Sequence, residues 1–135
     1  MTAIAGDDLA PWKVFADGTV VRVERDLADT VRIWIEEPKL RSAFGDGGTR
    51  FVLVLARCDQ LRYTPLDEPP LLELGAIAAS EPDLGPPSLV DRTVELRGSA
   101  GTLAVRYASL AIELDTGREL ALADLRQAAI TGRRH

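Results

Sequence analysis

The stretch GTLAVRYASLAIELDTGRELALADLRQAA (residues 101–129) decides the fold class of this chain. Its apolar side chains alternate with small or polar ones, first at odd positions over 103–107 and then at even positions over 110–114. Alternation with a period of two is typical of strands that bury one face. The change from odd to even positions predicts a bulge or a bend near Ala108 and Ser109. The stretch therefore predicts two consecutive β-strands.

A turn and a short helix complete this building block. Asp115-Thr116-Gly117 has the composition of a tight turn. Beyond the turn, Leu122, Leu125 and Ala129 share one face of a helix and polar residues occupy the opposite face. The glycine that follows is expected to end this helix, and residues 131–135 are expected to be frayed.

Two hairpins are predicted in the first third of the chain. Asp17-Gly18 separates the apolar pairs 14–15 and 20–21, and this dipeptide between apolar segments is a strong signal for a hairpin turn. Segments 20–25 and 30–36 are then expected to pair as a second hairpin. Within the second arm, the apolar side chains at odd positions share one face, as in a half-buried strand.

The middle of the chain supplies further strands and one ambiguous segment. Residues 51–58 are apolar at both odd and even positions, which predicts a central strand covered on both faces. Residues 61–64 and 90–97 alternate and predict two more strands. Residues 71–80 fit both a strand and a helix, and we favour a strand. The connection 39–44 is expected to be irregular or helical.

These segments together predict a mainly β protein. About eight short strands with a short C-terminal helix are typical of an antiparallel β-sandwich or a partly open β-barrel. The length of 135 residues is enough for one domain with its own core. We expect a single domain over residues 1–135, with residues 1–11 and 131–135 poorly ordered. The side chains expected to be almost fully buried are Leu53, Leu55, Val94, Val105 and Ile112.

The charge balance restricts the classes of partner. The 16 basic and 21 acidic residues give a net charge of -5, whereas binding to nucleic acid or to an anionic membrane requires a basic surface. A basic protein partner is therefore favoured over nucleic acid or a membrane. No apolar run approaches the roughly 18 residues of a spanning helix, and the N-terminus lacks the features of a secretory signal. With one cysteine and hence no internal disulfide, we expect a cytoplasmic protein.

The residues that usually carry chemistry are scarce. The chain has one histidine, His135 at the C-terminus, and one cysteine, Cys58 inside an apolar segment. This supply gives no recognisable metal spacing and no oriented base beside a nucleophile. Adjacent carboxylates such as Glu36 and Glu37 point to opposite faces of a strand, so they do not form an acid/base pair. We therefore expect no catalytic residue, no metal and no cofactor, and predict that the protein is not an enzyme.

Three stretches carry a resemblance to other proteins. They are FADGTVVRV (15–23), RFVLVLARCDQLRY (50–63) and GTLAVRYASLAIELDTGREL (101–120). In these β patterns the chain resembles a loose group of small bacterial proteins of uncharacterised or immunity-protein type. Immunity proteins of polymorphic toxin systems are cytoplasmic binders that block the surface of a toxin. The resemblance thus implies a protein-binding module that neutralises a cognate toxin.

The candidate partner-binding residues are surface residues. Trp34 falls on the less apolar face of its strand with Glu36 beside it, and an exposed tryptophan is a common binding anchor. The alternative interpretation is that Trp34 packs beneath the C-terminal helix. Asp67, Glu68 and Glu73 lie in or beside a proline-rich loop, where they either meet a basic partner or are simply hydrated.

A different class of function is left open beside protein binding. A small-ligand-binding or catalytic β-barrel would be expected to have a lined internal pocket. A protein-binding module would instead be expected to associate tightly with its partner.

Overall fold

Two antiparallel sheets and the helices that join them make up the structure, a computed structural model that describes residues 3–26 and 29–133. The six-stranded sheet, called sheet A, has the order β1-β9-β4-β3-β2, and β10 also pairs with β9. Its strands are β1 (Ile4–Ala5), β2 (Thr19–Asp26), β3 (Thr30–Glu36), β4 (Arg50–Ala56), β9 (Ser109–Leu114) and β10 (Glu119–Leu120).

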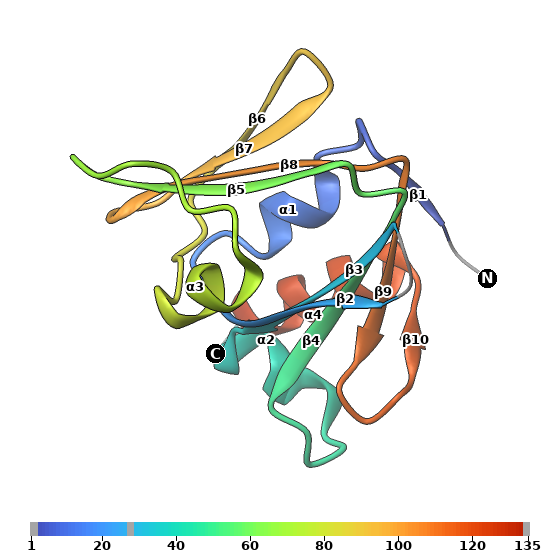
Figure 1. Cartoon of the computed structure of the whole chain (residues 1–135). Coiled ribbons are helices and arrows are strands. Elements are labelled where there is room, and N and C mark those ends of the chain that lie inside the picture. Colours follow the sequence, from blue (N-terminus) through green and yellow to red (C-terminus); the bar gives the residue numbers. More distant parts are fainter. Residues whose placement is uncertain (1–2, 27–28, 134–135) are drawn as a thin grey trace.

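The second sheet, called sheet B, has the order β5-β8-β7-β6 (Figure 1). Its strands are β5 (Gln60–Pro65), β6 (Pro87–Val90), β7 (Thr93–Arg97) and β8 (Gly101–Arg106). The helices within the described residues are α1 (Ala10–Val14), α2 (Pro38–Arg41), the 3-10 helix η1 (Ser42–Phe44), α3 (Leu74–Ala79) and α4 (Leu122–Arg133). The prediction of a mainly β protein with antiparallel sheets and a short C-terminal helix is confirmed, and the sheets do not close into a barrel.

The chain crosses between the sheets at two bends. One bend follows β4 and leads into β5, and the other follows β8 and leads into β9. The predicted bend near Ala108 and Ser109, where the apolar side chains change from odd to even positions, lies at the second crossing. The predicted central strand is also confirmed, since β4 lies between β3 and β9.

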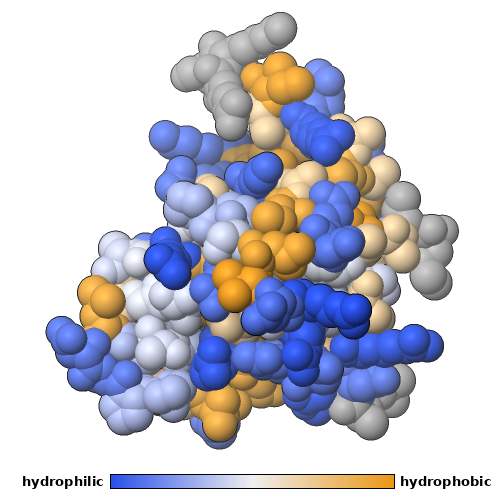
Figure 2. All heavy atoms as spheres, turned by 90° about the horizontal axis from the view of Figure 1, so that it is seen from above, coloured by the Kyte–Doolittle hydropathy of each residue, from blue (hydrophilic) through white to orange (hydrophobic). Residues whose placement is uncertain are grey.

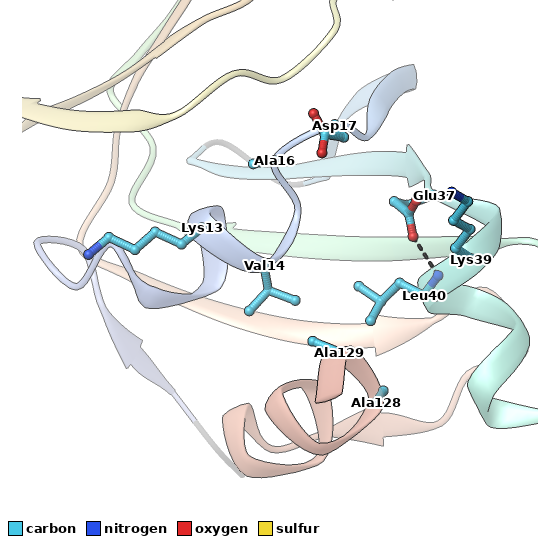
Figure 3. A pocket seen from close by; sticks show the side chains of 9 residues that line it. All are labelled: Lys13, Val14, Ala16, Asp17, Glu37, Lys39, Leu40, Ala128 and Ala129. Carbon is cyan, nitrogen blue, oxygen red and sulfur yellow. Dashed lines mark hydrogen bonds between the residues drawn. The ribbon is translucent and has the colours of Figure 1, made fainter. Parts of the chain in front are cut away.

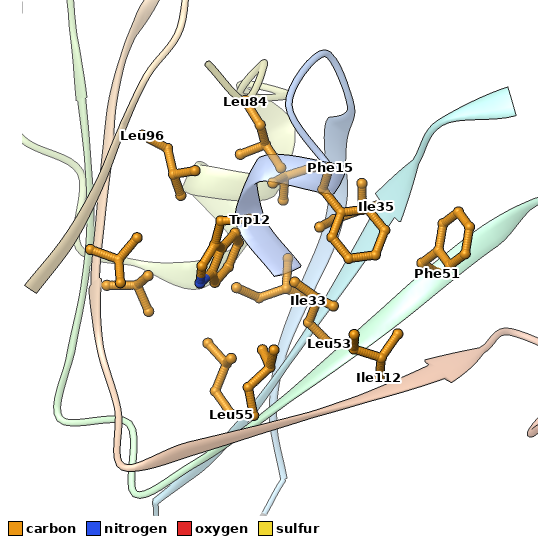
Figure 4. Close-up of a cluster of buried hydrophobic side chains, with 14 of the residues drawn as sticks. Trp12, Phe15, Ile33, Ile35, Phe51, Leu53, Leu55, Leu84, Leu96 and Ile112 are labelled. Atoms are coloured by element: carbon orange, nitrogen blue, oxygen red, sulfur yellow. The ribbon is translucent and has the colours of Figure 1, made fainter. Parts of the chain in front are cut away.

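The hydrophobic core lies between the sheets and is filled by α1. Trp12, in the middle of α1, and Phe15, just beyond its end, are fully buried between the inner faces of both sheets (Figure 4). The indole N–H of Trp12 donates a hydrogen bond to the Tyr107 hydroxyl, with 2.6 Å between the two atoms. All five predicted core residues are fully buried, namely Leu53, Leu55, Val94, Val105 and Ile112.

The predicted hairpin near the N-terminus is wrong. Residues 14–15 do not form a hairpin arm, because Val14 ends α1 and the turn at Asp17 joins a helix to β2. The Asp8 carboxylate accepts a hydrogen bond from the Ala10 N–H, and Pro11 stands in the first turn of α1. Both features favour a helix start. Within the N-terminal segment, β1 covers Ile4–Ala5 and α1 begins at Ala10.

Two further predictions require correction. The segment 71–80 contains the helix α3 rather than a strand, because the Glu73 carboxylate caps the N–H groups of Gly75 and Ala76. α3 packs against β2, at the edge of sheet A. The glycine at position 132 does not end the last helix, since α4 continues to Arg133. The connection 39–44 is helical, as one of the two predicted forms.

A buried arginine fastens the loop after η1 to the end of β9. Arg41 is 2% exposed; its Nη2 lies 2.8 Å from Asp115 Oδ1 and its Nη1 lies 2.6 Å from Asp46 Oδ1. The Nη1 contact is a close ion pair without the alignment of a good hydrogen bond. Asp115 also accepts the N–H groups of Thr49 and Arg50. The Arg41 guanidinium beside Asp46 holds the pKa of that carboxyl far below its usual range.

Candidate functional site

The outer face of sheet A carries the first group of predicted partner-binding residues. Successive side chains of a strand point to opposite faces of the sheet. Because Ile33 and Ile35 are fully buried in the core, Trp34 points outward from β3. The docking face is defined here as Arg22, Arg32, Trp34, Glu36 and Val52, on β2, β3 and β4.

Trp34 is the centre of the docking face. It is half-buried, and its register partners are Arg22 on β2 and Val52 on β4. The Arg22 guanidinium lies over the indole, with 4.7 Å between Cζ and the ring centroid. Val52 is only 4% exposed although it faces outward. The result is a small apolar centre with a cation stacked on it.

Ion pairs between strands of sheet A surround this centre. Arg32 lies 3.1 Å from Asp26 and 3.5 Å from Glu113, measured between side-chain nitrogen and oxygen. The Arg50 Nε atom lies 3.5 Å from Glu36 Oε2. These side chains remain partly exposed to solvent, so each pair contributes little to stability. They provide a polar border of both signs around Trp34.

The alternative position of Trp34 beneath the C-terminal helix is not what the structure shows. α4 contacts α1, α2 and η1. Its Leu125 is fully buried in the core that the inner face of sheet A lines. Trp34 lies on the opposite face of that sheet.

The second group of predicted residues lies at the far end of β5. Asp67 and Glu68 are exposed in the loop that joins β5 to α3. Leu66 and Leu72 in the same loop are 66% and 70% exposed. Glu73 is also exposed, but its carboxylate accepts two backbone N–H groups at the start of α3, so it serves as a helix cap.

The structure does not unite the two groups into one cluster. Trp34 and Glu36 lie on β3 in sheet A, whereas Asp67 and Glu68 extend from β5 in sheet B. Sequence reasoning missed Arg22, because its place opposite Trp34 depends on a register shift in β2. It also missed the exposed leucines Leu66 and Leu72, whose only signal was the density of prolines that keeps this segment out of regular structure.

The surface over sheet B has an apolar centre of its own. Figure 2 shows hydrophobic atoms in the middle of this face with hydrophilic atoms around them. Leu89 and Val90, on the edge strand β6, are 42% and 46% exposed. Pro87, the first residue of β6, has no N–H group to donate, and proline on an edge strand discourages pairing with another strand.

A shallow pocket of about 370 Å³ opens between α1, α2 and α4 (Figure 3). Val14, Leu40 and Ala129 converge at its floor. Lys13 and Lys39, the only lysines of the chain, stand at its rim. The Lys13 side chain extends away from the floor. The polar side chains of the pocket therefore do not converge on one ligand position.

The described part of the chain offers few side chains for nucleophilic or metal chemistry. Cys58 is 3% exposed, and burial raises the pKa of its thiol, which favours the unreactive protonated form. Residues 3–26 and 29–133 contain no group of three or more histidine, cysteine or carboxylate side chains placed to hold a metal ion. The described helices include none with the length and apolar character needed to cross a membrane.

No protein-family model, curated protein sequence or solved structure matches the chain.

Proposed function

We propose that this protein is a non-enzymatic protein-binding module that contacts its partner through the docking face around Trp34. The observation that carries the proposal is the half-buried indole of Trp34 beneath the Arg22 guanidinium, on an outward sheet face. Tryptophan and arginine are the residues most enriched among binding hot spots. A rigid apolar centre with a charged border is also the usual anatomy of a protein interface.

The filled core supports this proposal over a ligand-binding barrel. The space between the two sheets is occupied by α1, with Trp12 and Phe15 fully buried there. A small-ligand-binding barrel would instead keep that space open for its ligand.

A narrower form of the proposal identifies the partner as a basic toxin that this chain neutralises in the cytoplasm. Its support is the net charge of -5 together with the exposed carboxylates Asp67 and Glu68. Opposite charge on a partner accelerates the encounter, while an anchor residue sets how long the complex lasts.

Affinity capture with matched variants tests the proposal. Wild-type protein, Trp34→Ala and the control Leu72→Ala are immobilised and exposed to extract of the source cells. Leu72 is a large exposed apolar residue outside the docking face, so the control removes comparable surface. We expect one protein to be retained by wild type and control but not by Trp34→Ala. Equal retention by all three proteins would refute the proposal that the partner binds at the docking face.

The toxin form has its own readout. The captured protein is expressed with wild-type chain or with Trp34→Ala, and growth of the host is followed. We expect growth to be arrested by the partner alone, restored by wild type and not restored by the variant. A partner that is harmless when expressed alone would refute the toxin form while leaving the protein-binding proposal intact.

A further inference from the structure

Segments far apart in sequence meet at one end of the sandwich and line an open, shallow concavity of about 690 Å³. They are the turn after β1, the bend between β4 and β5, the turn between β6 and β7, and the bend between β8 and β9. This volume falls within the range of about 300–1000 Å³ that is typical of small-molecule sites. The charged residues that line it are Asp7, Arg57, Asp59, Arg92 and Arg106.

The charges of this concavity leave a surplus of free guanidinium groups. Arg106 is paired with Asp59, with 2.8 Å between Nε and Oδ1. Arg57 and Arg92 are exposed and form no ion pair with any residue that the structure describes. Only Asp7 remains to balance them in the lining. A positive concavity on a chain of net charge -5 is a local feature that the overall charge does not predict.

The backbone holds both free arginines in a conformation that favours glycine. Arg57 has a φ of 53° and Arg92 a φ of 65°. Asp91 and Arg92 together form a two-residue turn with positive φ at both positions, where the second position usually holds glycine. The left-handed region costs a residue with a side chain about 1 kcal/mol or more. Such strain is commonly retained where the side chain has a function.

Hydrogen bonds between the bends keep the concavity preformed. The Gly6 N–H donates to the Ala108 carbonyl at 3.0 Å, and the Ala108 N–H donates to the Ala56 carbonyl at 2.9 Å. The Asp59 N–H donates to the Arg106 carbonyl at 3.1 Å. A preformed site loses less conformational entropy when a ligand binds.

We propose that this concavity, the arginine cleft, binds a small oxyanion ligand that carries at least two negative charges. Guanidinium groups form paired, charge-assisted hydrogen bonds with phosphoryl and carboxylate oxygens. Arg57 and Arg92 contact the ligand, the Arg106–Asp59 pair adds no net charge, and Asp7 opposes binding by repulsion. The ligand chemistry is shared by phosphoryl and carboxylate groups. This site is independent of the docking face.

Calorimetric titration at low ionic strength tests the arginine cleft. Inorganic pyrophosphate and citrate are the two probes, and they separate a phosphoryl from a carboxylate preference. We expect saturable binding of at least one probe. Backbone amide signals of Gly6, Asp7 and Ala108 should shift in NMR spectra with the same saturation. If neither probe binds saturably at millimolar concentration, the proposal is wrong.

Matched variants locate the binding. Each of Arg57→Gln and Arg92→Gln should weaken it about tenfold, the scale of one hydrogen bond to a charged group. The control Arg97→Gln removes an exposed arginine five residues along from Arg92, which is about 16 Å away in a strand. We expect the control to bind like wild type. Equal weakening by the control would show a general charge effect and would overturn the proposal.

A variant with the opposite sign completes the test. Asp7→Asn removes the unpaired carboxylate of the lining and should tighten binding. The substitution is at an exposed residue, so thermal unfolding should stay unchanged and a folding defect cannot explain the result. Unchanged or weaker binding by Asp7→Asn would contradict the assignment of the ligand to this concavity.

Discussion

The Arg22 guanidinium is stacked on the Trp34 ring, with 4.7 Å between Cζ and the ring centroid. A register shift in β2 makes this contact, because the pairing moves from Val20 opposite Ile35 to Arg22 opposite Trp34. The extra residue lets Val20 and Val23 both face the core. The bulge thereby places the Arg22 guanidinium over Trp34, which lies outside the core.

The two tryptophans should differ in their access to solvent. Trp12 is fully buried and Trp34 is half-buried on the outer face of sheet A. In the variant Trp34→Phe, we expect the remaining emission to be shifted to the blue and protected from quenching by acrylamide. Wild type should show an additional quenchable component. Equal quenching of the two proteins would contradict the position of Trp34 on the outer face of sheet A.

Removal of the hydroxyl of Tyr107 should destabilise the core. In Tyr107→Phe the buried Trp12 N–H loses its acceptor, and an unsatisfied buried donor costs about 1–3 kcal/mol. Chemical denaturation measures the loss in free energy of unfolding. The control is Tyr63→Phe, because no hydrogen bond joins the Tyr63 hydroxyl to the described residues. A control that loses as much stability would refute a specific role for the Trp12 contact.

The same hydroxyl should give the protein a distinct response to alkali. Burial raises the pKa of Tyr107 to about 12 in the folded protein, above the ordinary value of about 10. A raised pKa means that the unfolded chain loses its proton first. The stability is therefore complete below about pH 10 and declines as the pH rises towards 12. Tyr107→Phe should lack this part of the decline, and an identical decline in wild type and variant would contradict it.

The Arg41 cluster should be the most sensitive charged site. Asp115→Ala removes an acceptor from a guanidinium that is 2% exposed and leaves two backbone N–H groups without it. We expect a loss of about 3 kcal/mol, the scale of a broken buried ion pair. Glu36→Ala breaks the exposed pair with Arg50 and should cost less than about 1 kcal/mol. Similar losses of stability in the two variants would refute the special role of the buried Arg41–Asp115 pair.

The carboxylate of Glu73 should contribute to stability rather than to docking. Glu73→Ala removes the N-terminal cap of α3 and should cost about 1 kcal/mol in thermal or chemical unfolding. Glu68→Ala, five residues earlier in the same loop, should leave stability unchanged because its side chain makes no described hydrogen bond. If Glu73→Ala is as stable as Glu68→Ala, the capping role is wrong.

The strands were predictable where one parity of the chain is apolar. β3 has the predicted bounds, and β4 is central because residues 51–58 are apolar at both parities. The helices α1 and α3 were not predictable from periodicity, because each has six residues or fewer and shows no full helical period. Their signals were the Asp8 carboxylate just before α1, which accepts the Ala10 N–H, and the Glu73 cap of α3.

The candidate site was predictable only in part. The alternation of residues 31–35 places Trp34 outward from the sequence alone. The stacking of Arg22 depends on a bulge, which no local pattern announces. The arginine cleft depends on four segments that meet only after the chain has crossed between the sheets, so the sequence shows its arginines as isolated charges.

Dissociation of the captured partner is the most direct test of the docking face. The partner is bound to immobilised wild type, Trp34→Ala and Leu72→Ala, and the decay of each complex is followed by surface plasmon resonance. A hot-spot tryptophan contributes about 2 kcal/mol or more to binding, so Trp34→Ala should dissociate at least about 30 times faster than wild type. Leu72→Ala should dissociate at the wild-type rate. A folded Trp34→Ala variant with wild-type dissociation would contradict the proposed function at its centre.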